Sequence, residues 1–111
     1  MNIQIYGSQK SFDTKKAERY FKERKIPYQY INIHEFGMGK SVFESAKRSI
    51  PIETMIDRKA KSYQTLYMDY IDEGKRESTL FENPSLFMTP IVRNGKEFTL
   101  GYCPEVWKEW S

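Results

Sequence analysis

Cysteine and histidine are almost absent from this sequence. Cys103 is the only cysteine, so no disulfide can form within the chain. His34 is the only histidine, and without a second histidine or a nearby cysteine it does not indicate a metal site. We therefore expect His34 to lie on the surface, and we expect no metal and no bound cofactor.

Long apolar runs are also missing. None approaches the roughly 20 residues that a membrane-spanning helix needs, and the first residues do not form a signal-peptide pattern. The 18 lysines and arginines against 15 aspartates and glutamates give a net charge of +3, too small to indicate nucleic-acid binding. These absences predict a soluble cytoplasmic protein that contacts neither a membrane nor nucleic acid directly.

The residues that are present suffice for one core. A chain of 111 residues suits a single domain, and we expect it to span residues 1–111. Aromatic residues make up 15% of the chain, so large side chains should dominate the interior.

The N-terminal third predicts a strand, a helix and a second strand. Residues 3–6 alternate apolar and polar side chains and are followed by a glycine. Residues 15–25 predict a helix that Asp13 or Thr14 would cap. Its narrow apolar side is formed by Ala17, Tyr20 and Phe21 at helical spacing, and the stem of Arg24 would extend it. Residues 28–33 form the second strand, and the spacing indicates a crossover between parallel strands.

The middle of the chain predicts helices. Ser41 and Glu44 fit a capping box for a helix that continues to about Arg48. Three more helices are expected, over residues 52–56 after a proline, over residues 63–71 with amphipathic spacing, and over residues 75–82.

The last part of the chain predicts a hairpin and a helix. Asn94-Gly95 favours a type I′ turn between strands at 90–92 and 97–100, and a helix should begin at Pro104. The resulting order is β-α-β, a helical insertion over about 38–83, and β-β-α. This order predicts an α/β fold with a thioredoxin-like four-stranded mixed sheet.

Four stretches together resemble the arsenate reductase-like (ArsC/Spx) family over nearly the full chain. They are Ile5-Tyr6-Gly7 through Lys15-Lys16-Ala17, Ile56 through Tyr63, Glu82-Asn83-Pro84 through Pro90-Ile91-Val92, and Gly101-Tyr102 before a tryptophan-bearing helix. The third is similar to the family's Glu-Asn-Pro-x-Leu and Arg-Pro-Ile-Val pattern. The resemblance implies a thiol oxidoreductase ancestry, with glutathione or thioredoxin as the reductant.

The departures from the family pattern affect its chemistry. Ser11 stands at the position of the nucleophilic cysteine, and Thr14 where some relatives have a second cysteine. Thr89 replaces an arginine that helps bind the oxyanion, and Asp57 occupies a turn where classical members place another. We therefore predict that this form is inactive as a thiol reductase, and the acidic Asp57 argues against arsenate reduction.

The resemblance also indicates site residues. Ser11 would hold the catalytic position, and the ligand would be bound by Lys10, Thr14, Thr89, Pro90 and Gly101, with Pro90 in the cis form. Ser11 could instead only cap the following helix, and the protein could be a pseudo-enzyme or carry a deliberate Cys→Ser change. Cys103 would be either a relocated thiol near Ser11 or a thiol without a role.

Three classes of function are compatible with these residues. The first is a thiol oxidoreductase scaffold that binds glutathione, a small oxyanion or a thiol protein. The alternative is an Spx-like transcriptional regulator or other protein-binding module that docks on an RNA polymerase subunit. A small structural protein is the third reading.

Overall fold

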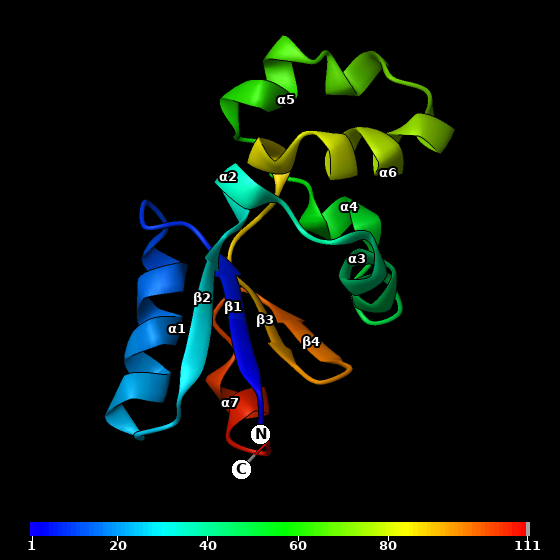
Figure 1. The fold of residues 1–111 in the computed structure, drawn as a ribbon. Coiled ribbons are helices and arrows are strands. Elements are labelled where there is room, and N and C mark those ends of the chain that lie inside the picture. The colour runs from blue at the N-terminus through cyan, green and yellow to red at the C-terminus, as the bar shows by residue number, and fades with distance from the viewer. Residues whose placement is uncertain (111) are drawn as a thin grey trace.

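β1 (Ile3–Gly7) is an inner strand of a four-stranded sheet with the order β2-β1-β3-β4. The computed structural model describes residues 1–110. β2 (Tyr28–Asn32) runs parallel to β1, whereas β3 (Ile91–Asn94) and β4 (Glu97–Leu100) form an antiparallel hairpin on its other side. The mixed four-stranded α/β sheet that the sequence predicted is confirmed (Figure 1).

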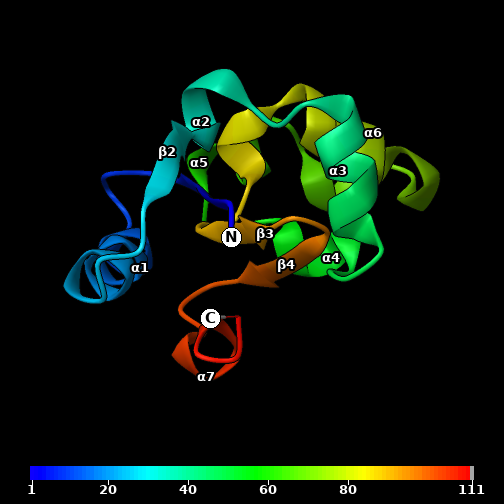
Figure 2. The same ribbon diagram turned by 60° about the horizontal axis from the view of Figure 1, so that its bottom comes forward.

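One face of the sheet is covered by α1 (Phe12–Glu23) and α7 (Pro104–Trp107) (Figure 2). Trp107 is buried, and its ring centroid lies 5.2 Å from that of Tyr20 and 5.1 Å from that of Phe21. The guanidinium of Arg24 lies 3.7 Å from the Tyr20 ring centroid, so it extends the apolar side of α1 as predicted. Aromatic contacts therefore fasten both helices to this face.

The opposite face and one end of the sheet are covered by the helical segments between β2 and β3. These are α2 (Ile33–Phe36), α3 (Lys40–Lys47), α4 (Ile52–Met55), α5 (Lys61–Thr65), η1 (Met68–Tyr70), α6 (Glu73–Glu82) and η2 (Pro84–Leu86). In Figure 1, α5 and α6 lie beyond the end of the sheet, near α2. Their apolar side chains share a core with the sheet residues Tyr6 and Ile91.

The predicted helix over residues 63–71 was wrong. The segment breaks into α5 and the short η1, because Tyr67 adopts a left-handed backbone conformation with φ of 54°. The carbonyl of Met68 accepts a hydrogen bond from the Arg76 guanidinium in addition to the Ile71 N–H, which lies at 3.4 Å. The apolar spacing was misleading here, since Tyr67 and Tyr70 are exposed, whereas Met68, which lies outside that spacing, is buried.

Three predicted details shift by one or two residues. The helix α3 begins at Lys40 with Gly39 as its cap, so the capping box at Ser41 was wrong. The helix α6 begins at Glu73, before Gly74 rather than after it. The hairpin turn is formed by Gly95 and Lys96, because Asn94 pairs with Glu97 across the hairpin. Gly95, the first central residue, has φ of +61°, whereas Lys96 does not have a positive φ, so the turn fits type II′ and not type I′.

None of the helices within residues 1–110 combines the length and the apolar character that crossing a bilayer requires.

Candidate functional site

The loop between β1 and α1 is held by its own serines and Thr14. The backbone N–H of Ser11 donates to the Ser8 carbonyl at 3.0 Å, and the N–H of Lys10 donates to the Ser8 hydroxyl at 3.2 Å. The hydroxyl oxygen of Ser11 accepts the Thr14 N–H at 3.2 Å, so Ser11 is the N-cap of α1. The prediction that Asp13 or Thr14 caps this helix was wrong, because the cap is Ser11.

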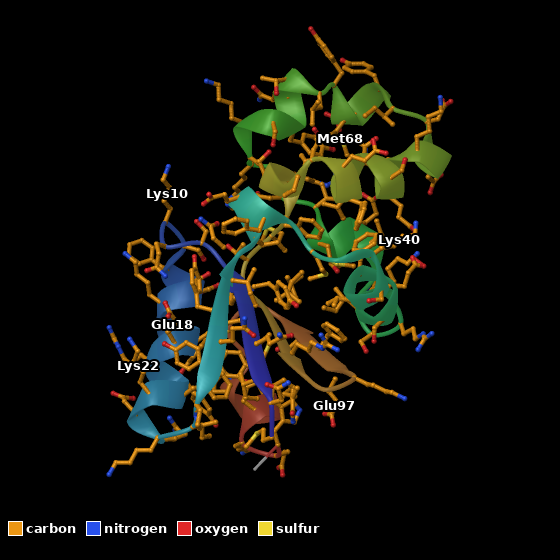
Figure 3. The ribbon with its side chains drawn as sticks, in the orientation of Figure 1. Lys10, Glu18, Lys22, Lys40, Met68 and Glu97 are labelled. Atoms are coloured by element: carbon orange, nitrogen blue, oxygen red, sulfur yellow. The ribbon has the colours of Figure 1, made fainter. Side chains whose placement is uncertain are left out.

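A cleft of about 610 Å³ opens beside this loop. Four segments that are distant in sequence meet there: the β1–α1 loop, the start of α2, the turn after α4, and the chain before β3. The cleft is lined by Ser8, Lys10, Ser11, Phe12, Asp13, His34, Asp57, Lys59, Met88 and Thr89. Figure 3 shows Lys10 extending from the loop at the N-terminal end of α1.

The charges that line the cleft nearly balance. The cations of Lys10 and Lys59 face the same space as the carboxylates of Asp13 and Asp57. The Asp57 carboxylate also accepts the Lys59 backbone N–H at 2.9 Å, which keeps it in the turn. Within residues 1–110, no three His, Cys, Asp or Glu side chains are grouped to hold a metal ion. A small dianion would therefore find no excess of positive charge here.

Two exposed apolar side chains add an apolar surface to the cleft. Phe12 is 82% exposed and Met88 is 37% exposed, although both are large and apolar. Side chains of this kind in a cleft with a few polar groups are typical of a ligand or peptide site.

Thr89 presents an unpaired backbone to the cleft. The Thr89–Pro90 peptide bond is cis, as the sequence predicted. The chain is held on both sides, because Met88 N–H donates to the Met55 carbonyl at 2.7 Å and Gly101 N–H donates to the Pro90 carbonyl at 2.8 Å. Among the hydrogen bonds formed within residues 1–110, none uses the N–H or C=O of Thr89. Thr89 therefore lines the cleft with a backbone N–H and C=O that have no partner among these residues.

His34 is the site residue that the sequence reasoning missed. It was expected on the surface, but its imidazole is partly buried, lines the cleft, and has Nε2 3.0 Å from the Phe87 carbonyl oxygen. The reason is that α2 begins directly after β2 and turns the chain back across the end of the sheet. A signal was available, since the ends of parallel strands meet at one edge and both predicted strands are followed there by polar residues.

Three other predicted residues lie outside the lining of the cleft. Thr14 is completely buried below the loop, where its hydroxyl accepts the Ser8 N–H at 3.2 Å, so its side chain cannot touch a ligand. Pro90 is buried, and Gly101, directly after β4, supports it through the hydrogen bond to its carbonyl. These residues can shape the cleft from behind, whereas Lys10, Ser11 and Thr89 line it.

Cys103 precedes α7 and packs against the core formed by α1, α7 and the sheet. Its thiol donates to the Leu100 carbonyl at 3.2 Å. Burial, followed by the charge of Glu105, raises the pKa of this thiol above its ordinary value. A thiol with a raised pKa is mostly protonated at neutral pH and is a poor nucleophile.

Comparison with known proteins gives consistent relatives. Residues 6–110 match the family model described as the ArsC family. The global transcriptional regulator Spx 2 of Oceanobacillus iheyensis is 28% identical over 106 residues, which cover 92% of this chain and 78% of that protein.

Solved structures with the same fold cover nearly the whole chain. A protein from Bacteroides fragilis that is described as related to the ArsC family has a TM-score of 0.84 at 17% identity, covering 100% of this chain and 98% of its own. An arsenate reductase from Vibrio cholerae has a TM-score of 0.81 at 19% identity, covering 98% and 97%. At these identities the likeness bears on the fold alone.

Proposed function

Since this chain belongs to the ArsC family, we propose that it is a binding protein on a thiol-reductase scaffold. In this proposal the cleft beside Ser11 holds an extended, peptide-like ligand, and no thiol chemistry takes place there. The main support is that the Ser11 hydroxyl caps α1 and has no adjacent base.

The hydroxyl of Ser11 has a structural task and no activating base. Its oxygen accepts the Thr14 N–H, and no hydrogen bond within residues 1–110 joins it to His34 or to a carboxylate. A serine hydroxyl is a weak nucleophile without an adjacent base, and it cannot form a disulfide. Cys103 does not line the cleft and has a raised pKa, so it does not replace the missing thiolate.

The lining of the cleft supports a peptide-like ligand. The unpaired N–H and C=O of Thr89 can pair with the backbone of an extended chain, as an exposed strand edge does. The nearly balanced charges suit a ligand with both a cation and a carboxylate, such as glutathione, better than arsenate. Phe12 and Met88 offer an apolar contact to its side chains.

A glutathione-coupled reductase assay tests the missing reaction. We expect no activity from the natural chain, from Cys103→Ser or from Ser11→Ala. The double variant Ser11→Cys/Cys103→Ser carries its only thiol at position 11. Activity in this variant would show that the natural chain lacks nothing but the nucleophile. Measurable activity in the natural chain, at the level reached by Ser11→Cys, would contradict the proposal.

Calorimetry with glutathione tests the ligand. Lys10→Glu and Lys59→Glu alter the cleft and should weaken binding by about threefold to tenfold, since each replaces an attraction with a repulsion near the surface. Lys61→Glu is the matched control, because Lys61 is exposed and does not line the cleft. Absence of heat from the natural chain would exclude glutathione as the ligand.

A second candidate is docking on RNA polymerase. It is favoured by the 28% identity to a protein named as the global transcriptional regulator Spx 2, over 92% of this chain. Purified RNA polymerase should then co-elute with the tagged chain in gel filtration, and Phe12→Ser should weaken the complex if the exposed Phe12 ring is part of the contact. Separate elution of the two would count against this role.

A further inference from the structure

The positive charge of this protein is concentrated in one segment. Residues 10–25 hold seven lysines and arginines against three aspartates and glutamates, a net charge of +4. The rest of the chain has a net charge of −1. The whole excess of positive charge therefore lies on the loop before α1, on α1 itself, and just after it.

Three of these cations form one line along α1. Lys15, Arg19 and Lys22 occupy positions i, i+4 and i+7, so they share one side of the helix over about 10 Å of its axis. We call these three residues the basic stripe. All three side chains are exposed, and Figure 3 shows Lys22 extending outward from α1.

The basic stripe is not neutralised within the chain. The ion pairs among residues 1–110 involve Lys47, Arg58 and Arg76 as their cations, and all lie in the helical insertion. Glu18 and Glu23 also lie on α1, but neither forms an ion pair with a stripe residue among the described residues, and the two carboxylate oxygens of Glu18 accept hydrogen bonds from Tyr28 at 2.9 Å and from Gln9 at 3.1 Å. The Glu18 carboxylate is thereby held by neutral donors and not by a cation of the basic stripe.

Shallow grooves lie on both sides of Arg19. One has a volume of about 340 Å³ and is lined by Gln9, Lys15, Glu18, Arg19 and Lys22. The other has a volume of about 270 Å³ and is lined by Lys16, Arg19, Tyr20, Glu23, Arg24 and Tyr102. In the second groove the ammonium of Lys16 lies 5.6 Å from the ring centroid of Tyr102, which is 42% exposed. An aromatic ring among cations is typical of a protein-binding surface.

We propose that the basic stripe of α1 and the two grooves beside it are a docking surface for an acidic segment of a partner protein. Uncompensated cations complement carboxylates of a partner, and they would also accelerate its encounter. Nucleic acid fits less well, because Glu18 and Glu23 line the same grooves and would face a continuous row of phosphates. The partner surface can instead place donors opposite these two glutamates.

This inference is independent of the ligand in the Ser11 cleft, since none of the three stripe residues lines that cleft. A charge-reversal experiment tests it with a fluorescent polyglutamate peptide as the probe, at low ionic strength. The stripe variant is Lys15→Glu/Arg19→Glu/Lys22→Glu. The matched control is Lys61→Glu/Lys75→Glu/Lys96→Glu, which makes the same change in net charge at three exposed lysines elsewhere.

The stripe variant should bind polyglutamate at least about tenfold more weakly, and the control should stay within about threefold of the natural chain. Binding should also weaken with added salt. Circular dichroism and the urea midpoint of both variants show whether they remain folded. Glutathione calorimetry on the stripe variant shows whether the change affects only the docking surface or also the Ser11 cleft.

Equal loss in the stripe variant and in the control would overturn the proposal, because net charge alone would then explain binding. Tighter binding of a DNA duplex than of polyglutamate, lost only in the stripe variant, would also overturn it and assign the surface to nucleic acid.

Discussion

Thr14 fills the space directly beside Gly7. A Cβ atom on Gly7 would lie 2.5 Å from Cγ2 of Thr14 and 2.6 Å from its hydroxyl oxygen. Thr14 has no exposed surface, and its hydroxyl accepts the Ser8 N–H, so it cannot move aside without losing that contact. The end of β1 and the first turn of α1 are therefore fitted to each other, and the loop that presents Ser11 depends on this fit.

Gly7→Ala should destabilise the protein by about 1–3 kcal/mol, because a methyl group would overlap the side chain of Thr14. Urea denaturation measures the change. Gly74→Ala is the matched control, since no atom lies within 4 Å of a Cβ at that position and alanine favours the helix. The control should stabilise the chain slightly, and Gly7→Ala/Thr14→Ala should cost less than the two single changes together. Additive costs would contradict the fit described above.

Ser11→Ala should lower the free energy of unfolding by about 1 kcal/mol, because the Thr14 N–H at the start of α1 loses its acceptor. Ser11→Asp keeps an acceptor and adds a favourable charge at the helix start, so it should retain the stability of the natural chain. Thermal and urea unfolding compare the three proteins. No difference between alanine and aspartate would mean that the cap contributes little.

Arg76 links three parts of the helical insertion. Its side chain is 11% exposed, and it donates to both carboxylate oxygens of Glu53 at 2.8 and 2.9 Å and to the Met68 carbonyl. Arg76→Met should cost about 2–3 kcal/mol, since it removes two charge-assisted hydrogen bonds to the Glu53 carboxylate and one to the partly buried Met68 carbonyl. Arg58→Met is the control. Arg58 is 66% exposed and its ion pair with Glu53 is long, at 3.6 Å, so its loss should cost less than about 0.5 kcal/mol.

The same pair predicts a dependence of stability on pH. Hydrogen bonds from Arg76 lower the pKa of Glu53 below its ordinary value. The folded state therefore favours the ionised carboxylate more than the unfolded state does. The contribution of this pair to the free energy of unfolding is fully present at pH values above the ordinary pKa of glutamate. It is lost as the pH falls through the lowered pKa of the folded state. The stability difference between the natural chain and Arg76→Met should therefore shrink in acid, and a constant difference from neutral to acid pH would contradict this linkage.

Alkylation of Cys103 by iodoacetamide should be slower than that of a small free thiol at neutral pH. The reacting species is the thiolate, and burial raises the pKa of this thiol. The rate should rise in urea, where the chain unfolds and the pKa returns to its ordinary range. Glu105→Gln removes a charge that raises the pKa, so this variant should react faster than the natural chain when folded. Faster reaction of the folded natural chain than of the free thiol would show an activated cysteine.

The sequence predicted most of the fold because its patterns are local. The alternation of residues 3–6, the helical spacing of Ala17, Tyr20 and Phe21, and the glycine turn before β4 each report which side of a segment faces apolar surroundings. The prediction from the sequence failed at residues 63–71, where Tyr67 adopts a left-handed conformation and Arg76 donates a hydrogen bond to the Met68 carbonyl. A contact between residues eight positions apart in different elements leaves no periodic signal.

The amino-acid sequence by itself determined that no thiol stands at position 11, that no internal disulfide exists, and that the positive charge gathers between Lys10 and Lys25. Those facts concern composition and order, and folding does not change them. Only the tertiary structure decided that His34 enters the cleft, that Thr14 is buried below it, and that Cys103 faces another core. The reason is that the direction of a side chain depends on how α2, α1 and α7 pack against the sheet, and packing is set by contacts between segments far apart in the chain.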